Sequence, residues 1–181
     1  MATIDLIVLG MIKQEAMSAY DIQKLVEYRN ISKWVKISTP SIYKKVLQLE
    51  KKGLIQGATH KEGKVEKVIY HITEAGEITF LNLMEETAKQ PVHFFLDFNA
   101  VIVNLMNITP PLRLMYLNHI KTQLLDLQSE IDQNLRTKEM DKQIPLVGVE
   151  VLKQQKQLTT TIMEWLVTLQ EEVQRYEKES L

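Results

Sequence analysis

A run of hydroxyl, amide and ammonium side chains between residues 38 and 48 is suited to contacting a nucleic acid. The candidates for DNA contact are Ser38, Thr39, Ser41, Lys44, Lys45 and Gln48. Hydroxyls and amides hydrogen-bond to phosphates or base edges, and lysine supplies positive charge. The alternative is an ordinary solvated helix face, and the residue types alone leave both interpretations open.

The residues around these polar positions predict a helix that presents them on one side. Thr39 suits the N-cap, and Pro40 suits the first helical position, where an amide would have no partner. Apolar residues recur on the opposite face at spacings of four and three, namely Ile42, Val46 and Leu49. Gly53 is expected to end the helix, because glycine tolerates positive φ.

Two strand-like runs follow this helix, the first over residues 54–56 and the second over residues 65–72. Residues 60–64 between them are expected to form a hairpin tip. The lysines of this region are further candidates for phosphate contact, although a solvated hairpin would have the same composition: Lys61, Lys64 and Lys67. A basic helix followed by a basic hairpin is typical of a winged helix-turn-helix, whose helix enters the major groove while its hairpin lies against neighbouring phosphates.

The flanking segments supply the rest of such a domain. Residues 4–13 predict a short buried helix, and Ser18 with Asp21 resembles a capping box that starts a second helix over residues 19–28. Trp34, in the connection to residues 38–48, is expected to pack in the core. Thr73 is expected to cap a helix that fades near Pro91, with an inward face of Ile78, Leu81 and Met84.

The second half predicts helices only. Residues 92–107 are apolar nearly all round, which is typical of a helix buried on several sides. Long amphipathic helices are expected from residue 112 onward and over residues 146–176. The last helix has a heptad-like seam, which we expect to form a dimer interface: Leu158, Ile162, Trp165, Leu169, Val173 and Tyr176.

These elements predict a mainly α protein with a small β-hairpin wing. Residues 1–90 would form a winged helix-turn-helix DNA-binding domain. Residues 91–181 would form an antiparallel helical dimerisation and effector domain. A homodimer would cover the apolar seam, and its two-fold symmetry would match an inverted-repeat operator in double-stranded DNA.

Charge and composition agree with this division. Residues 1–73 carry 12 Lys and Arg against 7 Asp and Glu, a net charge of +5, whereas residues 74–181 carry 10 against 16, a net charge of −6. A basic N-terminal half suits a polyanion, although an excess of this size also arises by chance. Residues 6–12 are apolar but follow an acidic residue and lack a cleavage site, so we expect a cytoplasmic protein with no membrane segment.

Nothing in the sequence indicates catalysis, a cofactor or a metal. There is no cysteine, and none of the four histidines is spaced as half of a metal-binding pair: His60, His71, His93 and His119. No phosphate loop or dinucleotide fingerprint is present. We therefore expect a protein that is not an enzyme.

The ordered motifs of residues 4–76 resemble the PadR family of transcriptional regulators. The resemblance rests on Leu9-Gly10, Met17-Ser18-Ala19-Tyr20, Ser41-Ile42-Tyr43, Leu49-Glu50, Gly53-Leu54, Tyr70 and Ile72-Thr73-Glu74-Ala75-Gly76. It implies a dimer joined by C-terminal helices, as in the long-tailed branch of the family, and DNA contacts by Tyr20 and Tyr43. The family's wing commonly reads Arg-Pro-Arg where this chain has Val65-Glu66-Lys67, so we expect the helix to contribute more to DNA binding than the wing.

The resemblance also implies a regulator controlled by a small aromatic effector. An effector pocket would have aromatic walls, and the candidates are Phe94, Phe95, Phe98, Tyr116 and Trp165. Plain hydrophobic core is the alternative for each of them. The function expected is a homodimeric DNA-binding repressor released by an effector, with activation as the other possible sign. The rival from another class is a winged helix that assembles with proteins and does not bind DNA.

Overall fold

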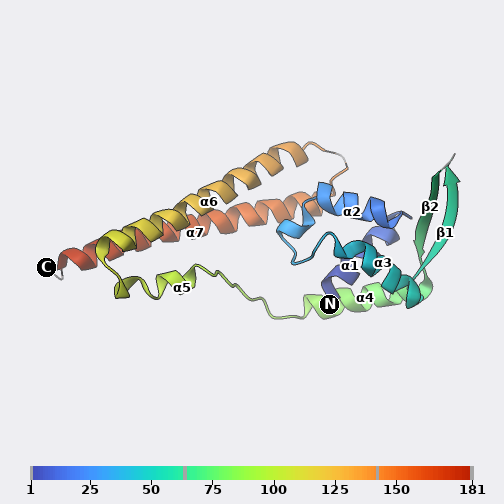
Figure 1. Ribbon diagram of the computed structural model, residues 1–181, viewed down its shortest axis with the longest axis horizontal. Coiled ribbons are helices and arrows are strands. Elements are labelled where there is room, and N and C mark those ends of the chain that lie inside the picture. Colours follow the sequence, from blue (N-terminus) through green and yellow to red (C-terminus); the bar gives the residue numbers. More distant parts are fainter. Residues whose placement is uncertain (1, 63–64, 142, 180–181) are drawn as a thin grey trace. The chain divides into compact units, whose positions relative to one another are not determined.

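A computed structural model describes residues 2–62, 65–141 and 143–179 of the chain (Figure 1). It divides into two compact units, Met1–Val92 and His93–Leu181. The first unit contains helices and one hairpin, and the second contains helices only among its described residues. No helix in the described ranges combines the length and the apolar character needed to cross a bilayer.

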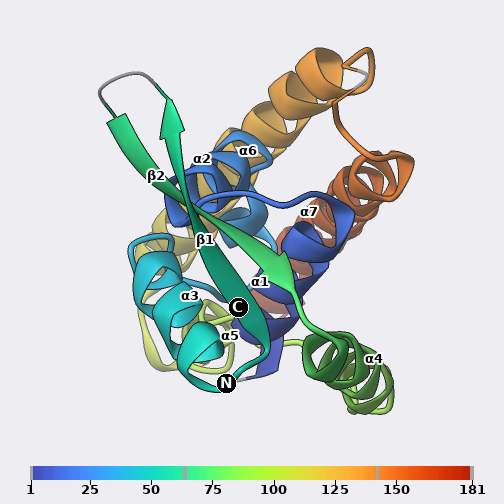
Figure 2. The same ribbon diagram turned by 90° about the vertical axis from the view of Figure 1, so that its right-hand side faces the viewer.

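The first unit is built around three helices, with the hairpin and a fourth helix at its C-terminal side. Its elements are α1 (Ala2–Gln14), α2 (Ala19–Tyr28), the 3-10 turn η1 (Ile31–Lys33), α3 (Ser41–Lys51), β1 (Ile55–Glu62), β2 (Val65–Ile72) and α4 (Glu74–Ala88). Figure 2 shows the hairpin in front of α1, with α3 and α4 on opposite sides of it. This is the winged helix-turn-helix expected from the sequence.

The core of this unit is apolar and is contributed by several of its helices. Val8, Ile22, Ile42 and Val46 are fully buried, and Trp34 packs against them as expected. The predicted capping box is also present, since Asp21 N donates to Ser18 Oγ while Asp21 Oδ2 accepts from Ser18 N. Local sequence signals therefore set where α2 begins.

The wing is longer than the sequence indicated. β1 continues to Glu62, and it pairs antiparallel with β2 in a register that places Lys61 opposite Glu66. The predicted tip at residues 60–64 was therefore wrong for residues 60–62, which lie within the strand. Low strand propensity at these polar residues is offset by the ladder of backbone hydrogen bonds and by a cross-strand charge pair.

Helix α4 has the opposite roll from the one expected. Ile78, Leu81 and Met84 are exposed, whereas Phe80 and Leu83 pack against the core. The cause is the buried Gly76 at the start of α4, which lies too close to the backbone of Leu54, in the connection between α3 and β1, for any side chain. Inward positions then follow Gly76 at helical spacing, which selects residues 80 and 83.

The second unit is dominated by a long antiparallel helix pair (Figure 1). Its elements are α5 (Asn99–Ile102), the 3-10 turn η2 (Leu105–Asn107), α6 (Pro110–Lys138) and α7 (Leu146–Glu179). Buried side chains recur every seven residues along each long helix: Leu117, Leu124, Ile131 and Lys138 on α6, and Leu152, Thr159 and Leu166 on α7, where Val149 is buried as well. This spacing is that of a helix pair with a continuous seam.

The predicted helix over residues 92–107 is absent, and only α5 and η2 form there. Two physical causes act on this segment. It is rich in β-branched residues and asparagine, which favour helices weakly. In addition, the guanidinium of Arg113 donates to the carbonyl oxygens of Leu105, Met106 and Ile108, and these bonds favour an irregular path.

The predicted seam of α7 is shared between the core of the chain itself and its surface. Ile162 and Leu169 pack with Leu166 against α6 of the same chain. Trp165 and Tyr176 are exposed, whereas Leu158 and Val173 are partly exposed. The seam expected to bind a second copy is therefore partly occupied within one chain.

Candidate nucleic-acid interface

The position of α3 is fixed by a hydrogen bond to the first strand of the wing. Glu50 Oε1 accepts from the backbone N of Gly57 at 3.1 Å. A Cβ atom on Gly57 would lie 2.7 Å from Glu50 Oε1 and from Val68, so this approach requires glycine. The helix and the wing are consequently held as one body.

A second joint connects α3, the wing and α4. Gly53 has φ +70°, the left-handed conformation expected where α3 ends. Thr73 Oγ1 donates to Gly53 O at 2.7 Å and accepts from Gly76 N at 3.1 Å. The most recognisable motif residues of the sequence therefore build the scaffold of the interface.

The outer face of α3 includes the exposed side chains of Tyr43, Lys44, Leu47 and Gln48. Tyr43 is 58% exposed. Ser41 is partly buried, and its Oγ donates to Ser38 O at 2.5 Å. The sequence placed Ser41, Lys44 and Gln48 on this side of the helix and gave Tyr43 as a separate candidate for phosphate contact. The structure leaves Tyr43, Lys44 and Gln48 exposed to a partner.

The start of α3 differs from the prediction. Pro40 occupies the N-cap position without a side-chain cap, and the helix begins at Ser41. Ser41 N and Ile42 N donate instead to the carbonyl oxygens of Ser38 and Thr39. Thr39 is therefore not the N-cap, because a turn beginning at Ser38 leads into the helix.

Lys45 does not belong to the outer face, which corrects the sequence prediction. It is only 8% exposed, and its Nζ lies 2.7 Å from Asp5 Oδ1 on α1. Position 45 lies three residues after Ile42 and beside Val46, so it adjoins the buried stripe of the helix. A charge at such a position needs an ionic partner inside the protein, and Asp5 provides it.

A hollow of about 720 Å³ opens between α2, α3 and β2. Tyr20 is 63% exposed and, with Tyr43, lines the helical side. The complete lining is Ser18, Ala19, Tyr20, Tyr43, Glu66, Lys67, Val68 and Tyr70. The two tyrosines expected to contact phosphates thus face the same space, which lies beside the outer face of α3.

Asp21 and Lys67 form an ion pair next to this hollow, with 2.7 Å between Oδ2 and Nζ. Burial acts to raise the pKa of Asp21, but hydrogen bonds from Lys67 and Ser18 outweigh it and hold that pKa below its ordinary value. Burial also raises the pKa of the Tyr70 phenol, with a further contribution from Glu50. Lys67 therefore lies at the interface with its charge already compensated.

The other wing lysines differ in how they are placed. Lys61 is exposed and its Nζ lies 3.0 Å from Glu66 Oε1 across the strand pair. Lys64 lies outside the described residues. Sequence reasoning missed the pairing roles of Asp21 and Glu66, since only the strand register shows which acidic and basic residues face each other.

The aromatic residues proposed for an effector pocket do not form one cluster in the second unit. Phe98 and Trp165 stack with ring centroids 6.3 Å apart. Phe94 and Phe95 are 71% and 84% exposed. Tyr116 is exposed and has His119 as its ring neighbour. Only Phe98 and Trp165 are brought together.

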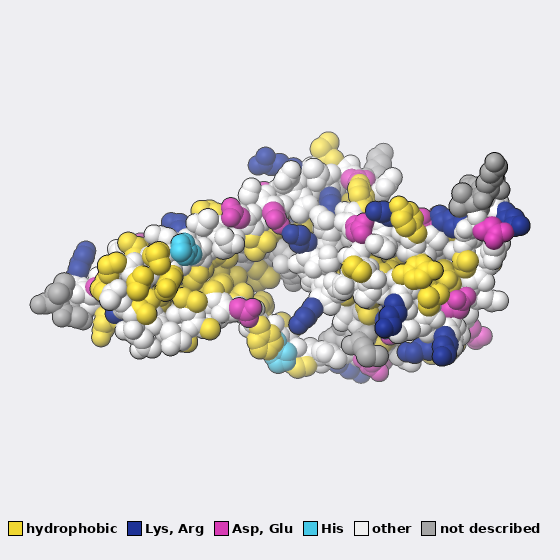
Figure 3. Space-filling model, viewed as in Figure 1, with side chains coloured by type: hydrophobic (Ala, Val, Ile, Leu, Met, Phe, Trp, Pro, Cys, Tyr) yellow, Lys and Arg dark blue, Asp and Glu magenta, His cyan; other side chains and the backbone are white. Residues whose placement is uncertain are grey.

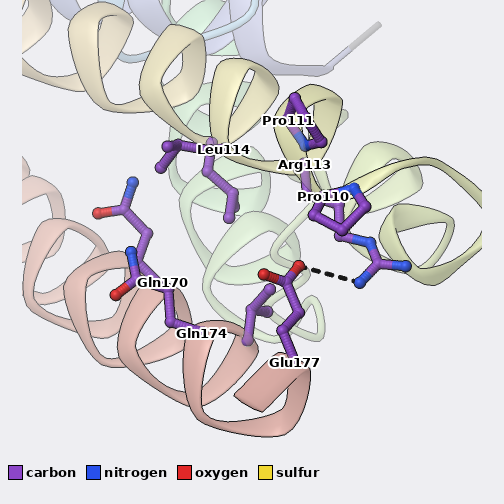
Figure 4. A pocket seen from close by; sticks show the side chains of 9 residues that line it. Pro110, Pro111, Arg113, Leu114, Gln170, Gln174 and Glu177 are labelled. Carbon is purple, nitrogen blue, oxygen red and sulfur yellow. Dashed lines mark hydrogen bonds and ion pairs between the residues drawn. The ribbon is translucent and has the colours of Figure 1, made fainter. Parts of the chain in front are cut away.

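A separate cavity of about 240 Å³ lies between α6 and α7 (Figure 4). Its lining contains none of the five aromatic candidates and consists of Pro110, Pro111, Arg113, Leu114, Leu117, Gln170, Val173, Gln174 and Glu177. The Arg113 guanidinium donates to Glu177 at 3.0 Å at one edge of the cavity. Because this guanidinium also binds three carbonyl oxygens, its charge serves to hold the fold.

Comparisons with known proteins agree with this geometry. Residues 8–81 match the model of the "Transcriptional regulator PadR-like family". No curated protein sequence matches the chain. This family consists of transcriptional regulators and not of enzymes, which agrees with the expectation from the sequence.

Solved structures of such regulators share the fold over nearly the whole chain. PadR of Bacillus subtilis, solved in complex with operator DNA, has 17% identity and a TM-score of 0.77, covering 93% of this chain and 96% of that one. A PadR-like transcriptional regulator of Bacillus cereus has 19% identity and a TM-score of 0.70, covering 98% and 99%. The virulence activator AphA of Vibrio cholerae has 16% identity and a TM-score of 0.69, covering 96% and 99%.

The first unit thus contains the winged helix that the family model describes, and the whole chain has the fold of solved PadR-like regulators. Residues 8–81, which match the model of the PadR-like family, are therefore identified as a transcriptional-regulator domain of that family.

Proposed function

We propose that this protein is a homodimeric DNA-binding transcriptional regulator, a repressor that a small-molecule effector releases from its operator. The observation that carries the proposal is the outer face of α3. Tyr43, Lys44 and Gln48 are exposed there, beside a hollow that Tyr20 also lines. Phenol, ammonium and amide groups on one exposed helix suit the major groove and its flanking phosphates.

The joints of the first unit support this role. The bond between Glu50 and Gly57 holds α3 to the wing, so both elements would meet DNA in one fixed geometry. PadR of Bacillus subtilis shares the fold and was solved in complex with operator DNA. In this proposal the first unit binds DNA and the second makes the dimer and receives the effector.

Apolar side chains on the long helices support the dimer. Leu114, Leu125 and Trp165 are each more than 40% exposed, at 47%, 49% and 42%. Figure 3 shows hydrophobic side chains gathered along α6 and α7. A second copy of the chain would cover this surface, and a two-fold dimer would match an inverted repeat with half-sites about one helical turn apart.

Support for the effector is chemical. PadR of Bacillus subtilis was also solved in complex with p-coumaric acid, at 15% identity and a TM-score of 0.73 to this chain. The stacked pair Phe98 and Trp165 is an aromatic wall in the second unit of this chain. We would titrate p-coumaric acid into the Trp34→Phe variant, in which Trp165 is the only indole, and follow both emission and DNA release.

The experiment that tests DNA binding is a salt series on the full-length protein. The log of the affinity for duplex DNA should fall linearly with the log of the salt concentration, whereas an apolar protein contact would show little dependence. Lys44→Ala should flatten the slope by about 0.9 for each phosphate that is no longer neutralised, or about 1.8 in a dimer. Lys89→Ala, at the C-cap of α4, is the control and should leave the slope unchanged.

Equal slopes for Lys44→Ala and Lys89→Ala would contradict the assignment of α3. A protein that does not bind DNA at any salt concentration would instead favour the rival function, a winged helix that assembles with proteins.

A further inference from the structure

We propose that Glu66 limits the affinity of this protein for DNA by holding Lys61 in an ion pair across the wing. The inference rests on the proposed function and deepens it, because it names a residue that sets the strength of the DNA contact. Both residues lie on the hairpin, on facing strands.

The wing is expected to lie against DNA phosphates, but the positive charge of each of its described lysines is neutralised by a carboxylate. Lys61 Nζ lies 3.0 Å from Glu66 Oε1, and the register places these two residues directly opposite each other. Lys67 Nζ lies 2.7 Å from Asp21 Oδ2. Each of these two ammonium groups therefore already has a carboxylate partner. Figure 3 shows acidic and basic side chains next to each other on the hairpin.

The two pairs differ in what they do. Asp21 also caps α2 through Ser18, so its bond to Lys67 belongs to the structure of the domain. Glu66 makes no comparable structural contact among the described residues, and its side chain is 63% exposed. An exposed pair of this kind contributes at most about 1 kcal/mol to stability, so Glu66 is not needed for folding.

The position of Glu66 gives it an effect on DNA. It lines the same hollow as Tyr20 and Tyr43, the two candidates for phosphate contact. A carboxylate there repels an incoming phosphate and competes with it for the ammonium group of Lys61. By contrast, Lys44 on α3 has no ion pair in the part of the chain that the structure describes.

Removing the carboxylate would therefore release Lys61 to DNA. Glu66→Gln keeps the size and polarity of the side chain and removes only its charge. Affinity for duplex DNA should then rise about fivefold per wing, the scale of one exposed charge interaction. The salt slope should steepen by about 0.9 per wing, because one more phosphate is neutralised.

Glu85→Gln is a closely matched control. Glu85 pairs with Lys89 on α4, and the side chains of that pair are 65% and 72% exposed, against 63% and 75% for Glu66 and Lys61. Both substitutions remove one negative charge from an exposed pair in the first unit. Only Glu66 lines the hollow, so only Glu66→Gln should tighten binding beyond the general effect of charge.

The measurement uses the full-length protein and a mixed-sequence duplex of about 30 base pairs. This length is enough for both DNA-binding units of a dimer to bind one helical turn apart. Binding curves over a salt series would be compared for the wild type, Glu66→Gln, Glu85→Gln, Lys61→Ala and the double variant Lys61→Ala/Glu66→Gln. Lys61→Ala alone should change affinity little, and in its background the gain from Glu66→Gln should shrink by at least half.

The outcomes are distinct. A gain from Glu66→Gln no larger than that from Glu85→Gln, or one that persists in full without Lys61, would overturn this inference while wild-type binding still supports the proposed function. Wild-type protein that fails to bind the duplex, or binds it without dependence on salt, would overturn the proposed function itself.

Discussion

Lys45 Nζ lies 2.7 Å from Asp5 Oδ1, and the side chains are only 9% and 14% exposed. The pair joins the first turn of α1 to the middle of α3, two helices that are far apart in sequence. It contributes to the orientation of the helix that carries Tyr43 and Lys44. The ammonium group of Lys45 thus helps to hold α3 in place and is not available to DNA.

Breaking this pair should destabilise the first unit. Asp5→Asn leaves the Lys45 ammonium buried without its anion, which should lower the free energy of unfolding by about 3 kcal/mol. Lys45→Met should cost less, because Asp5 lies in the first turn of α1, where the helix dipole favours a negative charge. Chemical denaturation followed by Trp34 fluorescence in a Trp165→Phe background measures both.

The control for this prediction is the exposed pair between Lys13 and Glu77, whose side chains are 39% and 50% exposed. Glu77→Gln should lower the free energy of unfolding by less than about 1 kcal/mol. A cost of Asp5→Asn as small as that of Glu77→Gln would contradict the prediction.

Acidification should remove the contribution of Asp21. Its pKa is lowered in the folded protein, because hydrogen bonds from Lys67 and Ser18 outweigh the opposite effect of burial. A carboxyl with a lowered folded-state pKa stabilises the protein above its ordinary pKa of about 4, and the contribution is lost as pH falls through the lowered value. Wild type should therefore be more stable than Asp21→Asn at pH 6, and the difference should shrink below about pH 4.

Urea midpoints at a series of pH values check this difference between wild type and Asp21→Asn. Lys67→Ala supplies the control, since losing that hydrogen bond should move the transition toward the ordinary pKa. A difference that stays constant from pH 6 down to about pH 3 would show that the charge of Asp21 is not involved.

Two glycines should respond in opposite ways to the same substitution. Gly76→Ala places a Cβ atom onto the carbonyl oxygen of Leu54, and no rotamer relieves a backbone contact. It should cost about 3 kcal/mol or more, as overpacking against a rigid neighbour does. At Gly148 the added atom would meet only Ile144 Cγ2 at 3.5 Å, so Gly148→Ala should stabilise α7 by up to about 1 kcal/mol. Thermal unfolding of the two variants makes the comparison, and similar effects would contradict it.

The sequence predicts features of this fold that depend on neighbouring residues. The Ser18–Asp21 capping box, the left-handed Gly53 and the Thr73 cap are all found where the sequence indicated. Each is decided by hydrogen bonds within three or four residues or by one residue's own φ. The order of helix, hairpin and helix follows from them.

Features that depend on distant partners could not be predicted in this way. The inward turn of Lys45 needs Asp5 from another helix, and the roll of α4 is set where Gly76 meets the backbone of Leu54. The pairing of Lys61 with Glu66 depends on the register of β1 against β2, which the residue types of the hairpin did not indicate. The candidate site was therefore predictable as a helix face but not in its distribution of charge.

A carboxylate on the α7 seam should separate the proposed dimer. Leu158 belongs to that seam and is partly exposed in the single chain, so a second copy would bury it further. Leu158→Glu would place a charge in an apolar interface and should shift the full-length protein from dimer to monomer at micromolar concentration. Gln157→Glu adds the same charge at an exposed position on another face of the same helix and should leave the dimer intact. Sedimentation velocity distinguishes the species.

Because a two-fold protein binds two half-sites together, the Leu158→Glu monomer should also lose most of its affinity for an inverted repeat. A dimer that survives Leu158→Glu would show that the chains associate through another surface, for which the exposed Leu114 and Leu125 of α6 are the next residues to substitute.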